Sequence, residues 1–316
     1  MRLNWLIPAS VFLATATATV AQDSNMIYPV SMIEQRLLRD TFRILEVRGS
    51  RRVGDRTQRV TISFADSIVM ITKWGAAPRN GEEFNNQPRY EVAAYDIQKL
   101  FLNEDDYVVP PTIMRAFDAP WFNAIKPDVS ATFGNTNSII AVVQFWLSNV
   151  RGDSVFDLKR FDRDTVYARH LGNLNILTYL IKHNDANAGN VLVSANTVNP
   201  RMFAVDNGVA FGIEESDRGT EWRDLRVPRI PAYTVERLRK ITREELDRTL
   251  GTVAEYEIRD KQLFAVEPTE NFSKGRGVRR KDNRIQFGLT KLEIDGVEQR
   301  LKNLLKRVDD GKLKTF

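Results

Sequence analysis

The alternation of hydrophobic and polar positions predicts a strand-rich first half of the chain. Apolar residues recur at about every second position in three short segments, and a continuous apolar run further on is typical of a buried strand. A helical period appears in two other segments, one of which begins at Pro88, a residue suited to a first helical turn. We therefore expect strands at residues 44–47, 57–64, 67–74 and 138–146, and helices at residues 31–43 and 88–102.

The second half of the chain alternates helical patterns with short strands. Thr242 is followed three residues later by Glu245, which predicts a capping box at the start of a helix. The pattern predicts strands at residues 191–194 and 202–205, and helices at residues 171–182, 234–240, 242–250 and 293–308.

The polar stretch of residues 147–153 separates these two halves. The pattern predicts an α+β fold with a strand-rich amino-terminal lobe, residues 22–146, and a mainly helical carboxy-terminal lobe, residues 147–270. Residues 271–316 are expected to form a basic helical tail that packs on the second lobe.

The amino terminus has the pattern of a secretory signal peptide. Arg2 precedes an apolar run over residues 5–20, and Ala21 offers a small residue for cleavage before Gln22. We expect residues 1–21 to be removed and the protein to be exported, either to a periplasm or outside the cell. An uncleaved anchor is the alternative, and no later segment is long and apolar enough to span a membrane.

Composition narrows the chemistry that the chain can perform. Its 316 residues include no cysteine and two histidines, which excludes thiol catalysis and metal sites built from cysteine or many histidines. A metal site would have to use carboxylate and amide oxygens, the ligands that Mg²⁺ and Mn²⁺ prefer.

Positive charge is concentrated near the carboxy terminus. Residues 274–316 contain 13 lysines and arginines against 6 aspartates and glutamates. This balance suits an anionic partner such as lipid headgroups or an acidic protein, and a solvated amphipathic helix is the alternative. We expect no nucleic-acid partner.

The first half carries three features that suit a bound phosphate. Lys73 continues an apolar strand face, so it either extends to solvent at the strand end or has an anionic partner. Glu91 begins the inward stripe of the helix that starts at Pro88, where a carboxylate needs a cation. The turn after the first strand, with Gly49, Ser50 and Gly54, could cover phosphates with backbone N–H groups.

The second half supplies two acids and an amide at the ends of short strands. Asp185 is followed five residues later by Asn190, and Asp206 opens the sequence Asp-Asn-Gly. Phosphoryl transfer requires a cation for the nucleotide phosphates, metal ligands, and a carboxylate that orients or deprotonates the attacking hydroxyl. The interval from Asp185 to Asn190 matches the catalytic loop of protein kinases.

Each of these residues also has a structural interpretation. Asp185 and Asp206 lie in sequences that commonly form turns, and Lys73 and Glu91 could form a surface pair. The two histidines, His170 and His183, are expected to be structural.

In these motifs the chain resembles the atypical kinases. These are the phosphoinositide kinases, the bacterial persistence-toxin kinases and, above all, the secretory-pathway casein kinases with their bacterial spore-coat relatives. The sequences that carry the resemblance are NDANAGN at residues 184–190, DNGVAFG at 206–212, TYLI at 178–181 and EVAAY at 91–95. The family loop usually has arginine and histidine where this chain has Ala186 and Asn187.

The resemblance implies a two-lobed protein-kinase-like fold that uses ATP with Mg²⁺ or Mn²⁺. It implies that Asp185 is the catalytic base, that Lys73 contacts the phosphates and that Glu91 pairs with Lys73. The remaining implied roles are metal binding by Asn190 and Asp206, phosphate covering by Gly49, Ser50 and Gly54, and an adenine hinge at residues 144–147 that includes Gln144 and Trp146.

The sequence therefore predicts an exported ATP- and metal-dependent phosphotransferase that acts on protein hydroxyls. One alternative is a catalytically inactive pseudokinase that binds a nucleotide or a partner protein. Another keeps the fold and changes the reaction to adenylyl transfer, or the acceptor to a lipid or a sugar.

Overall fold

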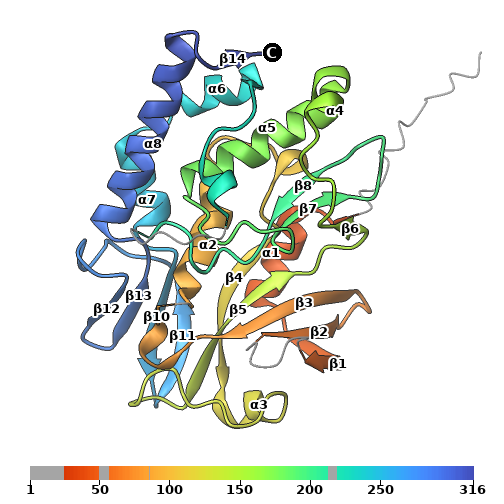
Figure 1. Cartoon of the computed structure of the whole chain (residues 1–316). Coiled ribbons are helices and arrows are strands. Elements are labelled where there is room, and N and C mark those ends of the chain that lie inside the picture. Colours follow the sequence, from red (N-terminus) through yellow and green to blue (C-terminus); the bar gives the residue numbers. More distant parts are fainter. Residues whose placement is uncertain (1–24, 50–56, 85, 213–218) are drawn as a thin grey trace, which may run out of the picture.

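The computed structural model describes residues 25–49, 57–84, 86–212 and 219–316 (Figure 1). The expected signal peptide, Ser50 and Gly54 lie outside these residues. No helix in the described part of the chain is both long and apolar enough to cross a membrane.

The first lobe is built on a five-stranded antiparallel sheet with the order β1-β2-β3-β5-β4. Alternation places Val60, Ile62 and Phe64 of the second strand on the buried face, as the sequence pattern predicts. The strands are β1 (Phe42–Gly49), β2 (Thr57–Phe64), β3 (Val69–Ala76), β4 (Thr112–Asp118) and β5 (Ser138–Phe145).

Strand β1 begins earlier than expected, because helix α1 (Val30–Arg39) is shorter than its predicted range. Asp40 has extended backbone dihedrals and ends the helix. Phe42 then packs edge-on against Phe64 and Trp74, with ring centroids 6.1 and 5.9 Å apart. Burial of this aromatic side chain in the sheet therefore outweighs the helical period that continues through residue 42.

Helix α2 (Pro88–Gln98) crosses the first lobe and is buried along most of its length. The side chain of Gln98 accepts hydrogen bonds from the backbone N–H groups of Val108 and Val109, at 2.8 and 2.9 Å. These hydrogen bonds hold the carboxy-terminal end of α2 in the first lobe. The short helix α3 (Ala119–Asn123) follows β4.

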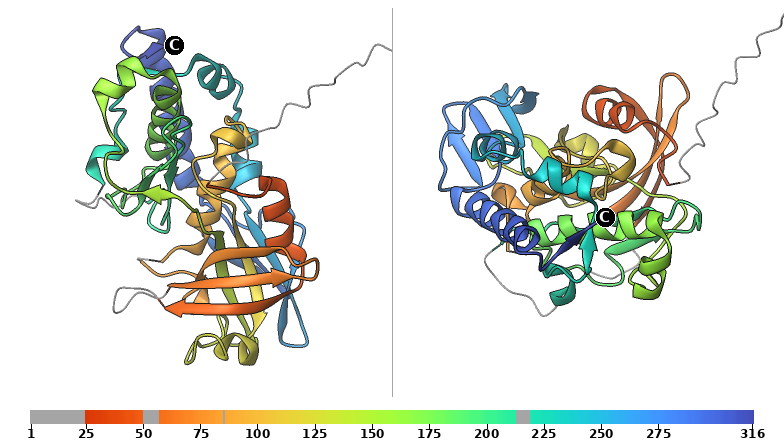
Figure 2. Two further views of the ribbon diagram at one scale, coloured as in Figure 1. Left: turned by 90° about the vertical axis from the view of Figure 1, so that its right-hand side faces the viewer. Right: turned by 90° about the horizontal axis from the view of Figure 1, so that it is seen from above.

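The second lobe is mainly helical and lies above the first in the left view of Figure 2. Its buried central helix starts before the predicted residue 171, because Asp164 caps it by accepting a hydrogen bond from the Tyr167 N–H. The helices of this lobe are α4 (Leu158–Arg163), α5 (Thr165–Leu180), α6 (Ala232–Leu238), α7 (Arg243–Leu250) and α8 (Lys291–Asp309). The predicted capping box of Thr242 and Glu245 is present at the start of α7.

Two small sheets complete the second lobe. One joins β6 (Val150–Arg151), β7 (Val191–Ser194) and β8 (Met202–Ala204), and it carries the loops expected to hold the site. The other pairs β9 (Arg229–Ile230) in parallel with β14 (Lys314–Thr315). Helix α8 contacts α5, α6 and α7.

A four-stranded antiparallel sheet over residues 254–287 is absent from the sequence-based expectations. Its order is β11-β10-β13-β12, and its strand β11 contacts β4 of the first lobe. Residues 271–316 are therefore not helical throughout, because β12 and β13 occupy the first part of that segment. The strands are β10 (Ala254–Arg259), β11 (Gln262–Val266), β12 (Val278–Lys281) and β13 (Arg284–Phe287).

This C-terminal sheet shares an apolar core with the first lobe. Tyr256, Ile285 and Phe287 of the sheet pack in one cluster with Val92 of α2 and Met114 of β4. The charged residues of the sheet hid its alternation from sequence analysis. A two-residue hairpin turn at Asp260 and Lys261, both of which have positive φ, joins β10 to β11.

Candidate active site

Lys73 and Asp206 meet where the two lobes face each other. Lys73 lies in β3 of the first lobe, and Asp206 lies two residues after β8 of the second. The Lys73 Nζ lies 3.1 Å from Asp206 Oδ1. The Lys73 side chain is 21% exposed and that of Asp206 is 52% exposed, so a solvent-borne ligand can reach the carboxylate.

The backbone at Asp206 is held in a left-handed conformation, with φ of 61°. Aspartate tolerates this region better than most residues because its short side chain bonds locally. Two backbone hydrogen bonds fix the segment that follows, from Gln87 N–H to the Gly208 carbonyl and from Phe211 N–H to the Ile181 carbonyl, at 3.1 and 2.6 Å. The turn therefore aims one acid at the interface between the lobes.

Glu91 supports this turn from helix α2. Its Oε2 accepts a hydrogen bond from the Asn207 backbone N–H at 3.0 Å, and its side chain is buried. Burial raises the pKa of Glu91, and the nearby charge of Asp206 raises it further, while Lys73 and the Asn207 N–H act in the opposite direction. Glu91, Lys73 and Asp206 thus form one electrostatically coupled group.

The loop after α5 brings Asp185 and Asn190 together. The Asn190 side-chain amide donates to Asp185 Oδ2 at 3.0 Å and to the Asp185 carbonyl at 2.8 Å. Asn187 donates to Asp185 Oδ1 at 3.0 Å, so both carboxylate oxygens of Asp185 accept amide hydrogen bonds. The Val205 N–H donates to the Asn190 carbonyl at 2.8 Å, which ties this loop to the strand that leads to Asp206.

Two glycines pack closely against the same loop. A Cβ atom on Gly219, which has φ of +70°, would lie 2.4 Å from the Ala186 backbone nitrogen. A Cβ atom on Gly152 would lie 1.9 Å from the Ala188 carbonyl oxygen. Ala186, where the family loop usually has a larger residue, is buried beside this contact.

His183 contributes to this loop, although sequence analysis assigned it no partner. It is fully buried, its Nδ1 accepts from the Asp185 N–H at 3.4 Å, and its Nε2 lies 3.2 Å from the Val205 carbonyl. Burial lowers the pKa of His183, so the neutral ring donates from Nε2 and accepts at Nδ1. The spacing of His183, Asp185 and Asn190 matches the His-x-Asp-x₄-Asn pattern of kinase loops, and that signal was available in the sequence.

His170 lies elsewhere in the second lobe. Its Nε2 lies 2.8 Å from the Asn199 Oδ1, and its Nδ1 lies 3.6 Å from an Asp106 carboxylate oxygen. These contacts are consistent with the structural role expected for this residue.

The other predicted nucleotide-binding residues of the first lobe lie at the end of β1 and in or just after β5. Gln144 is buried opposite Lys73 in the sheet register, and its side-chain amide donates to the Thr112 hydroxyl at 2.8 Å. Trp146 is 39% exposed, and the Arg59 guanidinium lies 5.1 Å from its ring centroid. Gly49 lies at the exposed end of β1, and its predicted partners in the phosphate-covering turn lie outside the described residues.

The donor set suits a hard divalent cation bound together with phosphate. Asp206 and Asn190 provide a carboxylate and an amide oxygen, and Asp185 lies beside them. No cluster of three or more histidines, aspartates or glutamates capable of holding a metal occurs among the described residues. Mg²⁺ commonly binds through one or two carboxylates together with substrate phosphates and water.

A hollow of about 520 Å³ lies beside the loop that carries Asp185. The Arg226 guanidinium lies 3.9 Å from the Phe156 ring centroid at this hollow and forms an ion pair with Glu221 at 3.0 Å. The lining includes Gly152, Phe156, Ala186, Asn187, Trp222 and Arg226. The hollow adjoins Asn187, which bonds the Asp185 carboxylate.

No protein-family model matches this chain, and no curated protein matches it in sequence. Solved structures do match it in three dimensions. Hydra Fam20, solved with sugar, superposes with a TM-score of 0.53 at 12% identity over 89% of this chain and 88% of that chain. The Golgi casein kinase superposes with a TM-score of 0.51 at 15% identity over 91% of this chain and 78% of that chain.

These similarities define the class of fold to which the structure belongs. The chain has a two-lobed protein-kinase-like fold, with a strand-rich first lobe and a mainly helical second lobe, as the sequence predicted. Hydra Fam20 and the Golgi casein kinase are thus two of its structural neighbours. At this level of identity the comparison establishes the fold.

Proposed function

We propose that this protein is an ATP-dependent phosphotransferase that transfers the γ-phosphoryl group to a hydroxyl of another protein. The observation that carries the proposal is the 3.1 Å contact of Lys73 with Asp206 across the two lobes, beside the Asp185–Asn190 loop. This arrangement supports the proposal, because phosphoryl transfer uses a cation for the phosphates, metal ligands and a carboxylate for the attacking hydroxyl.

In this proposal the chain's own residues position the reactants. Lys73 binds the nucleotide phosphates, and Asp206 with Asn190 holds Mg²⁺ or Mn²⁺, which neutralises phosphate charge when bound. The acceptor hydroxyl oxygen forms a bond to the γ-phosphorus as the bond to the bridging oxygen breaks, and the Asp185 carboxylate takes the hydroxyl proton. The amides of Asn187 and Asn190 hold that carboxylate in a fixed orientation.

The hydrogen bonds of these two amides favour the hypothesis of an active enzyme over that of a protein that only binds a nucleotide. The family's arginine and histidine are missing from the loop, yet Asn187 and Asn190 together satisfy both Asp185 carboxylate oxygens. The small residues of the loop also fit the close approach of Gly152 and Gly219. Loop support is therefore supplied by different residues, which favours an enzyme over a pseudokinase.

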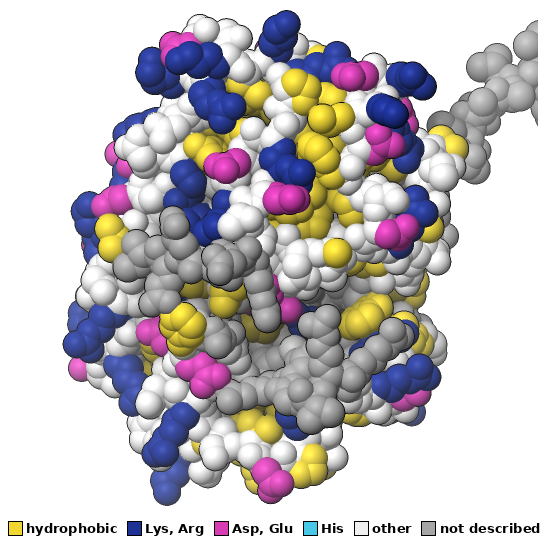
Figure 3. Space-filling model, in the orientation of Figure 1, with side chains coloured by type: hydrophobic (Ala, Val, Ile, Leu, Met, Phe, Trp, Pro, Cys, Tyr) yellow, Lys and Arg dark blue, Asp and Glu magenta, His cyan; other side chains and the backbone are white. Residues whose placement is uncertain are grey.

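Within the basic carboxy-terminal segment, we expect an acidic protein partner to bind around strands β12 and β13. Three lysines of helix α8 pair with acids four residues away, for example Lys302 with Glu298 at 2.5 Å. Arg243 of α7 pairs with Asp295 of α8 at 2.6 Å. Four exposed cations of the β12–β13 region, Lys274, Arg276, Arg280 and Lys281, form no ion pair with the other described residues. Figure 3 shows Lys and Arg side chains gathered along this edge of the molecule.

The Asp206→Ala variant tests the proposal. Wild-type protein is incubated with Mg²⁺ or Mn²⁺, dephosphorylated casein as a trial acceptor, and ATP labelled at either the α or the γ phosphate. We expect transfer of the γ label alone, and loss of at least about a hundredfold of this activity in Asp206→Ala, because a group that stabilises transition-state charge is removed. Asp162→Ala, at a 71% exposed aspartate side chain, serves as the control.

Each other result has a defined meaning. Equal γ transfer by wild type and Asp206→Ala would show that the site is wrongly assigned. Transfer of the α label would identify an adenylyltransferase, and binding of ATP without transfer of either label would identify a nucleotide-binding protein. Transfer to a lipid or sugar but not to casein would change the acceptor class.

A further inference from the structure

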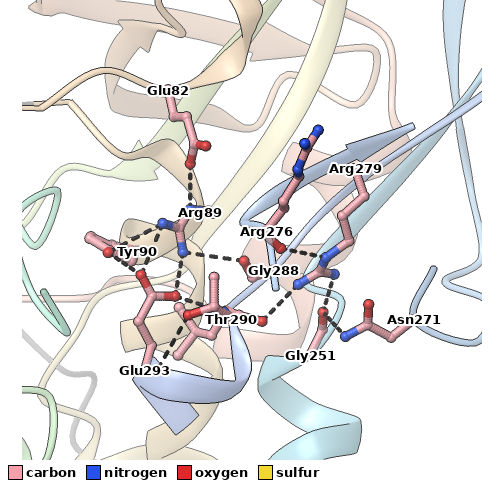
Figure 4. Close-up of polar contacts among 11 residues, drawn as sticks. Glu82, Arg89, Tyr90, Gly251, Asn271, Arg276, Arg279, Gly288, Thr290 and Glu293 are labelled. Atoms are coloured by element: carbon pink, nitrogen blue, oxygen red, sulfur yellow. Dashed lines mark hydrogen bonds and ion pairs between the residues drawn. The ribbon is translucent and has the colours of Figure 1, made fainter. Parts of the chain in front are cut away.

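The first turn of helix α2 is fastened to the carboxy-terminal segment by one buried arginine (Figure 4). Arg89 donates from Nη1 and Nη2 to the two carboxylate oxygens of Glu293, at 2.7 and 3.0 Å. Its Nε donates to Glu82 at 2.8 Å, and Nη1 also donates to the Gly288 carbonyl at 3.3 Å. Arg89 is 5% exposed, so this two-pronged pair is shielded from water.

Glu293 has three roles in this arrangement. Besides binding Arg89, it completes the capping box of α8 by accepting from the Thr290 N–H at 2.7 Å, and it accepts the Tyr90 hydroxyl hydrogen bond. Burial raises the pKa of Glu293, but the hydrogen bonds and charge of Arg89 more than offset this and keep the pKa below its usual value. The start of α8 and the start of α2 therefore depend on the same carboxylate.

A second buried guanidinium, that of Arg279, lies near Arg89 and increases the need for the negative charge of Glu293. Arg279 of β12 donates to the Leu289 and Arg276 carbonyls, both at 2.7 Å. Burial and the nearby charge of Arg89 lower the pKa of Arg279 to about 10. Two buried cations thus lie close together, and Glu293 and Glu82 provide the negative charge that balances them.

The fastened turn leads directly to the candidate active site. Tyr90 follows Arg89, and its ring centroid lies 5.6 Å from that of Phe211, after the Asp-Asn-Gly motif. Glu91 comes next and accepts the hydrogen bond from the Asn207 N–H. A continuous set of contacts therefore joins Glu293 on α8 to the backbone beside Asp206.

We propose that Arg89 and Glu293 are positioning residues that set the placement of α2 relative to the Asp206 turn. The pair holds the first turn of α2 against α8, and Glu91 then holds Asn207, so that Asp206 keeps its contact with Lys73. The effect of this pair on turnover rests on the proposed phosphotransferase function. Its effect on the positions of α2 and Asn207 does not, because that effect concerns the fold alone.

Glu293→Gln is the most selective substitution for testing this role. Glutamine also completes capping boxes, so the start of α8 is retained while the charge that faces Arg89 is removed. The control is Lys302→Met on the same helix, where the lost ion pair involves a lysine side chain that is 65% exposed.

A glycine pair supplies an independent test that leaves both ionic residues in place. A Cβ atom on Gly277 would lie 2.1 Å from the Arg89 Nε, so Gly277→Ala must displace the guanidinium. A Cβ atom on Gly275 would have its nearest neighbour at 4.0 Å, so Gly275→Ala is a matched control two residues away.

The main measurement is hydrogen exchange of the full-length protein, resolved at the α2 amides and at the Asn207 amide. We expect exchange at these amides to rise about tenfold in Glu293→Gln and Gly277→Ala and to stay at the wild-type rate in both controls. Steady-state kinetics should show kcat/KM for ATP falling about tenfold in the same two variants.

The outcomes separate this proposal from the proposed function. Faster exchange confined to the first turn of α8, with Asn207 and α2 as protected as in wild type, would overturn the positioning role and leave Glu293 as a local cap. If wild-type protein transfers no phosphate, the phosphotransferase function fails. The exchange rates at Asn207 then decide the positioning role without reference to activity.

Discussion

Small side chains around Asp185 determine how the candidate catalytic loop is held. Ala186 is buried where Gly219 approaches, and Asn187 bonds the Asp185 carboxylate. At the scale of single residues, the loop is therefore held by the amides of Asn187 and Asn190 and by this close backbone approach.

Gly219→Ala should disturb this loop directly. The new Cβ would meet the Ala186 nitrogen at 2.4 Å, and the left-handed backbone of residue 219 adds a steric cost of about 1–2 kcal/mol for any L side chain. We expect a lower free energy of unfolding in chemical denaturation, and γ-phosphate transfer reduced at least about tenfold by displacement of the loop.

Gly134→Ala is the matched control, because no atom lies within 4 Å of a Cβ atom at that position. Wild-type activity in Gly219→Ala would show that the exact position of the loop is unimportant for transfer.

His170 provides a pH-dependent test of the second lobe. Burial, helped by the charges of Arg169 and Arg201, lowers the pKa of His170 from 6.5 to about 4, while Asn199 and Asp106 act in the opposite direction. The folded pKa lies below the unfolded one, so the stabilisation is complete above pH 6.5 and is lost as the pH falls towards 4. The full loss corresponds to about 3 kcal/mol.

The measurement is the free energy of unfolding of wild type and His170→Gln at pH 7 and pH 4.5. Glutamine cannot take up the proton, so the variant should lose about 2–3 kcal/mol less than wild type between these two values. His183 is present in both proteins and serves as the internal reference. Equal losses in the two proteins would show that His170 is protonated as easily in the folded state as in the unfolded one.

At the scale of elements, local signals predicted much of the structure. The alternation in β2, the apolar run of β5 and the capping box of α7 each depend on neighbouring residues alone, and each is present as expected. The boundary between α1 and β1 was wrong, because the aromatic partners of Phe42 come from distant strands. The sheet of residues 254–287 was missed for a related reason, since its buried face fits a core supplied by the first lobe.

The candidate site was predictable to a similar extent. Lys73, Asp185, Asn190 and Asp206 lie on the expected elements, because short motifs mark loops whose spacing is set by local geometry. The close packing of Gly219 and the fastening of Arg89 could not be predicted, because both join residues distant in the chain. His183 was overlooked although its spacing from Asp185 was visible.

At the scale of the whole molecule, the C-terminal sheet is part of the main structure. Phe287 is fully buried and packs with Tyr256 at 6.1 Å and Phe133 at 6.1 Å between ring centroids. We expect Phe287→Ala to lower the free energy of unfolding by about 3–5 kcal/mol, because a large cavity opens between the sheet and the first lobe. Thermal denaturation followed by circular dichroism measures this loss.

Phe264→Ala, at a 47% exposed phenylalanine of the same sheet, is the control and should cost less than about 1 kcal/mol. A loss as small in Phe287→Ala would indicate that the sheet is an appendage that unfolds separately from the first lobe.

The late position of this sheet in the chain has a consequence for biosynthesis. A nascent chain that ends near residue 250 already contains Lys73, Asp185 and Asp206, but the apolar side chains that the sheet covers, including Val92 and Met114, still face water. Arg89 also lacks the Glu293 carboxylate until residue 293 has been made. A premature stop codon or a proteolytic cut after α7 would therefore leave every candidate catalytic residue intact and yet yield an aggregation-prone, incompletely assembled protein.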